Sequence, residues 1–250
     1  MSSNELGPSG DLSGRVALVT GGGRGIGAAT AIVLARAGAI TVVTARSRDE
    51  LEETASLIAG IGGKVSSVVG DLTNQDFVFS LFEEVERKHG RLDILVNNAG
   101  RADFAPVEVA DADAFRSVLE LNTIAPYACM REAIRLMKVG EDDGFIVNIG
   151  STEAYWTAYG ESGFYPASKF ALRAITMAVS KELKQAGSGI RVCMVNPGGT
   201  NTRSVNPSGE ADPRLLDPFD VGRAVLHVVT AGPGVHVFDT VLLSQSAYPW

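Results

Sequence analysis

Short runs of Val, Ile, Leu and Ala alternate along this chain with longer segments in which apolar residues recur at a helical period. The predicted strands are 15–20, 40–44, 64–69, 93–96, 145–149, 190–195 and 237–243. The predicted helices between them are 25–37, 49–58, 74–89, 111–138, 165–185 and 220–229. Strands that alternate with helices pair in parallel under two helical layers, and both faces of such strands are apolar. We therefore expect an α/β fold with a single doubly wound parallel sheet and helices on both faces.

The length of the chain indicates one domain. Its 250 residues are enough for one large domain with a substantial core, and neither a linker nor an internal repeat divides the sequence. We expect a flexible N-terminal tail at 1–13 and one domain at 14–250.

Composition argues against several classes of partner and site. The net charge is −7 without a basic cluster, so nucleic acid is not an expected partner. Neither a long apolar stretch nor a signal peptide is recognisable, so no membrane association is expected. Cys129 and Cys193 lie in apolar segments, and His89, His227 and His236 are scattered. We expect buried thiols, no metal site and a reducing, cytoplasmic location.

A glycine-rich loop follows the first predicted strand and opens the first predicted helix. It reads Thr20-Gly-Gly-Gly-Arg-Gly-Ile-Gly27. Glycine lets the backbone turn sharply and approach a ligand, and a helix N-terminus presents unpaired N–H groups to a pyrophosphate. In this strand–loop–helix context the loop predicts a dinucleotide site rather than a plain turn.

A phenol and an ammonium group stand four residues apart in Tyr165-Pro-Ala-Ser-Lys169. Residues at i and i+4 share one face of a helix, so Lys169 is expected near Tyr165. A tyrosine ordinarily titrates near ~10, and a nearby cation lowers that pKa. The pair is compatible with a tyrosine that exchanges a proton near neutral pH. Because this spacing is common by chance, the alternative is an ordinary tyrosine with a solvated lysine.

The motifs resemble those of the short-chain dehydrogenase/reductase family in type, order and spacing from about residue 14 to 230. The segments that carry the resemblance are Gly21-x-x-x-Gly25-x-Gly27, Asn97-Asn-Ala-Gly100, Tyr165-x-x-x-Lys169 and Asn196-Pro-Gly198. The domain at 14–250 is accordingly expected to be a dinucleotide-binding catalytic domain.

The resemblance implies a catalytic set of Asn122, Ser151, Tyr165 and Lys169. Tyr165 would exchange the proton of a carbonyl or alcohol, and Ser151 would orient the substrate oxygen. Lys169 would lower the pKa of Tyr165 and hold the nicotinamide ribose. Asn122 would anchor a water that links Lys169 to solvent; alternatively, it is a buried asparagine that satisfies backbone groups.

Two details depart from the family's usual pattern. Gly150 stands where a second serine often occurs, and Ser151 precedes Tyr165 by one residue more than expected. Thr152 is therefore a rival for the hydroxyl role, because it restores the shorter spacing. Tyr159 is a poorer rival for Tyr165, since Gly163 occupies its i+4 position.

The residues after the second predicted strand indicate NADP(H) rather than NAD(H). An acidic residue there binds a ribose 2′-hydroxyl, whereas an arginine suits a 2′-phosphate. This chain has Ala45 followed by Arg46, and Arg24 of the glycine loop is expected to reach the same phosphate; the alternative is two solvated surface arginines. The full set expected to bind the cofactor is Gly21, Arg24, Gly25, Ile26, Gly27, Arg46, Asp71, Leu72, Asn98, Ala99, Gly100, Tyr165, Lys169, Pro197, Gly198, Thr200 and Thr202.

Two loops are expected to form the substrate pocket, 152–164 with its aromatic side chains and 199–217 as a lid. Local packing is the alternative for the aromatic residues, which include Tyr155 and Trp156. The expected activity is NADPH-dependent reduction of a ketone, aldehyde or 3-oxoacyl group. The alternatives are a dehydrogenase of a small alcohol or 3-hydroxy acid, and a non-catalytic dinucleotide sensor. The resemblance also implies a small-molecule substrate and a homodimer or homotetramer.

Overall fold

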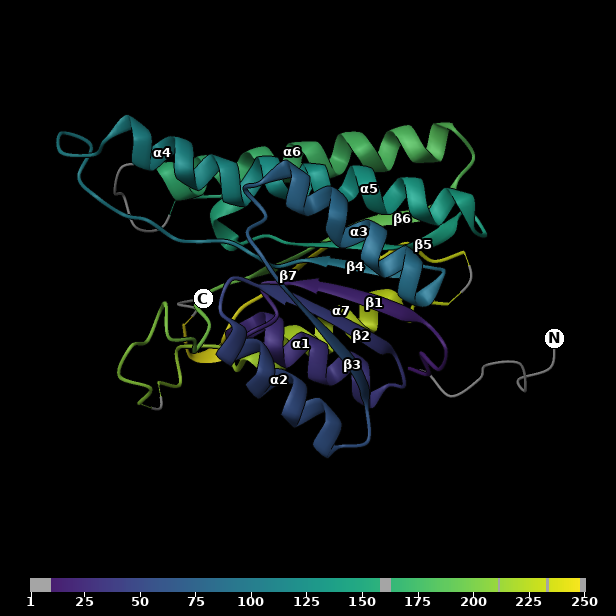
Figure 1. Ribbon diagram of the computed structural model, residues 1–250. Coiled ribbons are helices and arrows are strands. Elements are labelled where there is room, and N and C mark those ends of the chain that lie inside the picture. Colours follow the sequence, from purple (N-terminus) through teal and green to yellow (C-terminus); the bar gives the residue numbers. More distant parts are fainter. Residues whose placement is uncertain (1–9, 158–162, 211, 233, 248–250) are drawn as a thin grey trace.

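One parallel sheet organises the molecule (Figure 1). The computed structural model describes residues 10–157, 163–210, 212–232 and 234–247. The sheet has seven strands in the order β3-β2-β1-β4-β5-β6-β7, and every neighbouring pair is parallel. The strands are β1 Val16–Thr20, β2 Ile40–Ala45, β3 Lys64–Val69, β4 Ile94–Asn97, β5 Asp143–Ile149, β6 Gly189–Pro197 and β7 Asp239–Leu242. The predicted doubly wound sheet is confirmed.

Two helical layers bury the two faces of the sheet, as Figure 1 shows. Side chains of α1, α2 and α7 pack against one face, and side chains of α3, α5 and α6 pack against the other. The helices are α1 Gly25–Arg36, α2 Arg48–Gly60, α3 Gln75–His89, α4 Ala112–Leu119, α5 Ala125–Val139, α6 Phe164–Gln185 and α7 Pro218–Val229. Burial from both sides explains why the central strands are almost entirely apolar.

The direction of winding reverses between β1 and β4. From β1 the chain builds β2 and β3 on one side, and β4 to β7 then extend the sheet on the other side. The carboxyl ends of β1 and β4 therefore lie at the topological switch point of the sheet. Ligands of open α/β sheets bind at this switch point.

Some elements differ from their predicted extents. The predicted helix 111–138 consists of α4, a π-helical turn η1 at Glu120–Ile124, and α5. The last strand is shorter than predicted, and α7 begins at Pro218 after an Asp217 cap. Boundaries of this kind depend on caps and side-chain contacts that hydrophobic periodicity does not record.

The expected flexible tail lies mostly outside the described residues, which begin at Gly10. Leu12 is buried, and its N–H donates to the Ala37 carbonyl at 2.6 Å. The division into a tail at 1–13 and a domain at 14–250 stays a prediction. In the described ranges, no helix has the length and apolar character needed to span a lipid bilayer.

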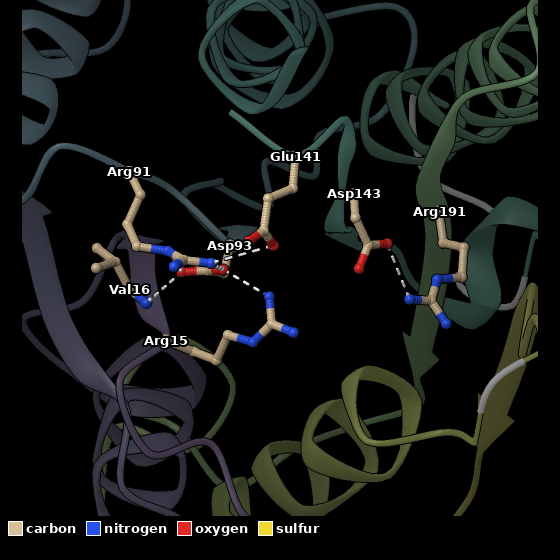
Figure 2. A network of polar contacts seen from close by, with 7 residues as sticks. All are labelled: Arg15, Val16, Arg91, Asp93, Glu141, Asp143 and Arg191. Carbon is tan, nitrogen blue, oxygen red and sulfur yellow. Dashed lines mark hydrogen bonds and ion pairs between the residues drawn. The ribbon is translucent and has the colours of Figure 1, made fainter. Parts of the chain in front are cut away.

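A buried carboxylate ties the amino ends of the central strands together (Figure 2). Asp93 precedes β4 and is 4% exposed. Its oxygens accept hydrogen bonds from Arg15 at 2.7 Å, from Arg91 at 2.6 and 2.9 Å and from the Val16 N–H at 2.8 Å. Burial acts to raise the pKa of Asp93, but these bonds, led by those from Arg91, hold it below its usual value. The cluster lies at the amino edge of the sheet, opposite the edge that carries the glycine loop.

Candidate active site

The glycine loop closes tightly over the carboxyl end of β1. Gly21 has a φ of +62°, and a Cβ there would lie 2.9 Å from the Ala99 Cα. A Cβ on Gly27 would lie 2.2 Å from the Gly21 carbonyl oxygen and 2.4 Å from Asn98 Nδ2. Only glycine fits these two positions. The backbone of the loop thereby stays open to a ligand at the N-terminus of α1, where N–H groups and the helix dipole favour an anion.

Thr20 and Asn98 join the loops that follow β1 and β4. The Thr20 hydroxyl accepts hydrogen bonds from the N–H groups of Asn98 and Ala99 at 3.0 and 3.1 Å. Asn98 Nδ2 donates to the carbonyls of Thr20 and Gly21 at 2.9 and 3.2 Å. The structure thus brings together two motifs that lie about 77 residues apart in the sequence.

The loop after β6 reaches the glycine loop from the other side. The Thr202 methyl group lies 3.2 Å from the place of a Cβ on Gly25. Thr200 is buried, its hydroxyl donates to the Gly198 carbonyl at 3.0 Å, and the Leu216 N–H donates to Gly199 at 2.8 Å. This last bond joins the two ends of segment 199–217, the predicted lid. The segment begins just after Pro197, the last residue of β6, and Gly198.

The residues expected to select the cofactor lie where β2 and β3 end. Arg46 follows β2 and is exposed, while Arg24 precedes α1 and forms an ion pair with Glu50 at 3.1 Å. Asp71 follows β3, and a hydrogen bond from the Thr73 N–H is the main cause that lowers its pKa. Leu72 is buried and Ile26 packs against the core. Sequence patterns did not reveal Glu50, because nothing local marks a pairing across 26 residues.

Asn122 holds the loop after β4 through its side chain. Its Oδ1 accepts from the Arg101 N–H at 2.9 Å, and its Nδ2 donates to the Arg101 carbonyl at 2.9 Å and to the Ser168 hydroxyl at 3.0 Å. It belongs to the π-helical turn η1, a distortion that often marks functional sites. The backbone-satisfying role of Asn122 is thus present, and it places η1 against the residue that precedes Lys169.

Lys169 is buried beside Tyr165 on α6. Lys169 is 5% exposed, and its Nζ lies 5.6 Å from the centre of the Tyr165 ring. The same Nζ donates to the Ile149 carbonyl at 2.9 Å, at the end of β5. Burial lowers the pKa of Lys169 to about 8. That value is still above neutral, so the proposed role of Lys169 as a cation beside the phenol is compatible with its burial.

Ser151 and Thr152 are both buried at the turn after β5. The Ser151 hydroxyl accepts from the Glu153 N–H at 3.1 Å and caps the short helix η2, Thr152–Ala154. The Thr152 methyl group faces Gly198, 3.9 Å from the place of a Cβ there. As an acceptor from Glu153, Ser151 keeps its own proton available for donation. The choice of Ser151 over Thr152 stays a prediction, and Tyr159 lies outside the described residues.

Comparison with known proteins decides the family. Residues 15–213 match the model of the short chain dehydrogenase family. The chain belongs to the short-chain dehydrogenases. Dehydrogenase/reductase SDR family member 11 of Gallus gallus is 34% identical over 241 residues, which cover 91% of this chain and 94% of that protein. Farnesol dehydrogenase of Aedes aegypti is 35% identical over 239 residues, with 92% and 96% covered.

Solved short-chain dehydrogenase structures share the fold over most of its length. A metagenomic short-chain oxidoreductase in complex with NADP superimposes with a TM-score of 0.81 at 31% identity, covering 92% of this chain and 97% of that one. A dehydrogenase/reductase from Sinorhizobium meliloti 1021 reaches 0.86 at 32% identity, covering 94% and 95%.

In this short-chain dehydrogenase, Asn196 explains why position 150 is glycine. A Cβ on Gly150 would lie 2.0 Å from Asn196 Oδ1, so a larger residue would collide with this side chain.

Asn196 also belongs to a polar cluster around Tyr155. Asn196 Nδ2 donates to Asp239 at 2.6 Å, and Asp239 also accepts from the Tyr155 hydroxyl at 2.5 Å. Arg173 of α6 stacks over the Tyr155 ring at 4.2 Å. Burial, reinforced by Asp239, raises the pKa of Tyr155 to about 12. The phenol of Tyr155 is thus bound in a polar cluster, while Trp156 stays 41% exposed.

Across the described part of the chain, no group of three His, Cys, Asp or Glu side chains could hold a metal ion.

Proposed function

We propose that this short-chain dehydrogenase is an NADPH-dependent oxidoreductase that reduces a carbonyl group to an alcohol. The observation that carries the proposal is the buried Lys169 beside Tyr165, at the same edge of the sheet as the glycine loop. Tyr165 and Lys169 are the pair that a non-catalytic sensor would have no need to retain.

The residues around the glycine loop suit a dinucleotide. A Cβ on Gly21 or Gly27 would collide with the loop after β4 or with the Gly21 carbonyl, so these glycines allow the two loops to pack closely beside the N-terminus of α1. NADPH, when bound, supplies the hydride. Arg24 and Arg46 are proposed to bind its 2′-phosphate, and Asp71 and Leu72 its adenine. Similar solved structures hold NADP or 5-hydroxy-NADP, which supports this choice.

Tyr165 is proposed to donate its phenolic proton to the substrate oxygen as that oxygen gains negative charge. Lys169 stabilises the phenolate left behind and holds the nicotinamide ribose. Ser151 donates a hydrogen bond to the same substrate oxygen. Asn122 keeps the loop after β4 in place and anchors a water next to Lys169. General acid catalysis of this kind contributes roughly 10²–10⁴-fold to the rate.

The substrate is proposed to be a ketone, aldehyde or 3-oxoacyl compound, enclosed by loops 152–164 and 199–217. The reverse reaction, oxidation of a small alcohol or 3-hydroxy acid, uses the same residues, and the similarity to a farnesol dehydrogenase favours keeping it as second candidate. Cys129 and Cys193 are free, buried thiols, which suits a reducing, cytoplasmic location.

The test of function is oxidation of NADPH against a panel of ketones, aldehydes, quinones and 3-oxo esters, with NADH in parallel. We expect turnover of at least one carbonyl class and a higher kcat/KM with NADPH. Equal or better kcat/KM with NADH would contradict the cofactor assignment. Tight NADPH binding without turnover of any carbonyl or alcohol would favour the sensor instead.

A homodimer or homotetramer is proposed for the solution state. The outer faces of η1, α5 and α6 expose the apolar side chains of Ile124, Tyr127, Phe170 and Met177, each more than 40% exposed. Apolar surface of this kind marks protein contacts. Light scattering should give a mass of two or four chains, and a monomeric mass would refute this proposal.

A further inference from the structure

Arg24, one of the two arginines proposed to bind the 2′-phosphate, already has an anionic partner. Its guanidinium donates to the carboxylate of Glu50 at 3.1 Å. Arg24 is the residue before α1, and Glu50 lies in the first turn of α2. Figure 1 shows these two helices on the same face of the sheet. The ion pair therefore joins the first turn of α2 to the glycine loop at the proposed nucleotide site.

The position of Glu50 is fixed by the fold rather than by Arg24. Ser47 caps α2 and accepts from the Glu50 N–H at 3.4 Å. One turn further, the Thr54 hydroxyl donates to the Gly23 carbonyl at 3.0 Å, which ties α2 to the glycine loop. A Cβ on Gly23 would lie 3.0 Å from the Glu50 Cβ. Glu50 is thus held directly over the loop, with its side chain 29% exposed.

A bound 2′-phosphate and Glu50 compete for the same guanidinium. A phosphate monoester carries about −1.5 to −2 charges at neutral pH, so it both attracts Arg24 and repels the nearby carboxylate. Binding of the phosphate requires Arg24 to leave Glu50 or to be shared with it. The apparent Kd equals the intrinsic Kd divided by the fraction of protein in which the binding group is available. A ribose 2′-hydroxyl carries no charge, so its binding does not require Arg24 to leave Glu50.

We propose that Glu50 is a specificity-determining residue of the nucleotide site. By holding Arg24 in an ion pair, Glu50 weakens binding of the 2′-phosphate and lowers the preference for NADP(H) over NAD(H). This inference rests on the proposed NADP(H) function. It adds an acidic residue that weakens the binding of NADP(H). Replacement of Glu50 by a neutral residue strengthens NADP(H) binding without a new contact to the cofactor.

The test is a titration of cofactor-free protein with NADPH and with NADH, followed by fluorescence, for four variants. Glu50→Gln should lower the Kd for NADPH by about two- to fivefold, the size measured for partly exposed ion pairs, and leave the Kd for NADH unchanged. Glu53→Gln removes an equal charge from the same helix at an exposed position and should change neither Kd. Arg24→Ala should weaken NADPH binding, and Glu50→Gln should add nothing in the Arg24→Ala background.

The outcomes separate this inference from the proposed function. The inference is overturned if wild-type protein prefers NADPH, Arg24→Ala weakens NADPH binding, and Glu50→Gln leaves the Kd unchanged. It is also overturned if Glu50→Gln improves NADPH binding equally with and without Arg24, because Glu50 then acts by general repulsion. The proposed cofactor itself fails if wild-type protein binds NADH more tightly and Arg24→Ala has no effect on NADPH. Thermal melts of each variant confirm that the fold is retained.

Discussion

At the residue scale, burial sets what Lys169 can do. An exposed lysine beside Tyr165 would be fully charged but screened by water, whereas Lys169 is 5% exposed and makes its hydrogen bond to the Ile149 carbonyl. Desolvation lowers its pKa to about 8, which is still above neutral. A protonated amine in a medium of low dielectric acts strongly on a neighbouring group, and this is the effect proposed for Lys169 on the Tyr165 phenol.

This burial predicts a pH dependence of stability. Between the folded pKa of about 8 and the ordinary value of 10.5, the unfolded chain binds a proton that the folded protein has lost. Stability rises with pH when the unfolded state binds more protons, so the unfolding free energy of wild type should rise relative to Lys169→Met in this window, by at most about 3 kcal/mol. Denaturant unfolding of cofactor-free protein from pH 7 to 10 measures the difference.

The comparison has an internal control. The thiols of Cys129 and Cys193 and the phenol of Tyr155 also have shifted pKa values, but both proteins share them and their effects cancel. Lys181→Met, at an exposed position of α6, should reproduce the wild-type profile. A difference between wild type and Lys169→Met that stays flat or falls with pH would show that Lys169 is not desolvated.

The close packing around Gly27 predicts that a substitution there affects both stability and NADPH binding. A methyl group there would meet the Gly21 carbonyl oxygen at 2.2 Å, so Gly27→Ala must displace the loop backbone. We expect a loss of about 1–3 kcal/mol in unfolding free energy and at least about tenfold weaker NADPH binding. Gly60→Ala, in α2 with open space around it, is the matched control and should leave binding intact. Calorimetric titration with NADPH checks both variants, and intact binding in Gly27→Ala would remove the loop from the cofactor site.

At the element scale, the π-helical turn and the turn after β5 carry two of the side chains proposed to be catalytic, Asn122 and Ser151. Periodicity predicts helix throughout 111–138, and the π turn at Asn122 does not interrupt that pattern. The side chain of Asn122 donates hydrogen bonds to Arg101 and Ser168, which lie far from it in the chain. The sequence could not predict these contacts or the π turn, and the role of Asn122 stays a prediction.

The pairing of Gly150 with Asn196 predicts a conditional effect. Gly150→Ser restores the serine that often stands at this position in the family, but its Cβ would lie 2.0 Å from Asn196 Oδ1. Overpacking of this kind costs about 1–3 kcal/mol. Asn196→Ala removes the obstructing oxygen, so Gly150→Ser should be less costly in that background. Unfolding free energies of the two single variants and the double variant give the coupling, and simple additivity would rule out the steric account.

At the scale of the whole molecule, local patterns predicted the sheet, its helical layers and the order of the motifs. Strand and helix periods are properties of single segments, and parallel pairing follows from their alternation. The ion pair of Arg24 with Glu50 and the cluster of Asn196, Asp239 and Tyr155 could not be predicted in this way. Each depends on where two side chains meet after folding, and no sequence spacing records that.

The Asp93 cluster predicts how the sheet is stabilised as a whole. Asp93→Asn weakens charge-assisted bonds to Arg15 and Arg91 at a buried position between β1 and β4. Hydrogen bonds to charged groups contribute about 1.5–3 kcal/mol, so the variant should lose roughly that amount of unfolding free energy. Asp113→Asn, whose partner Arg116 is also exposed, should change stability little. Equal losses of unfolding free energy in both variants, measured by denaturant unfolding, would show that the buried cluster contributes no more than an exposed ion pair.

The central claim is that Tyr165 transfers the proton in an NADPH-dependent carbonyl reduction. Tyr165→Phe removes only the phenolic oxygen, so the most direct measurement pairs steady-state NADPH oxidation with NADPH titration of the same variant. We predict a fall in kcat of about 10²-fold or more, with the Kd for NADPH within about twofold of wild type. Near-native turnover by Tyr165→Phe with NADPH still bound would contradict the account.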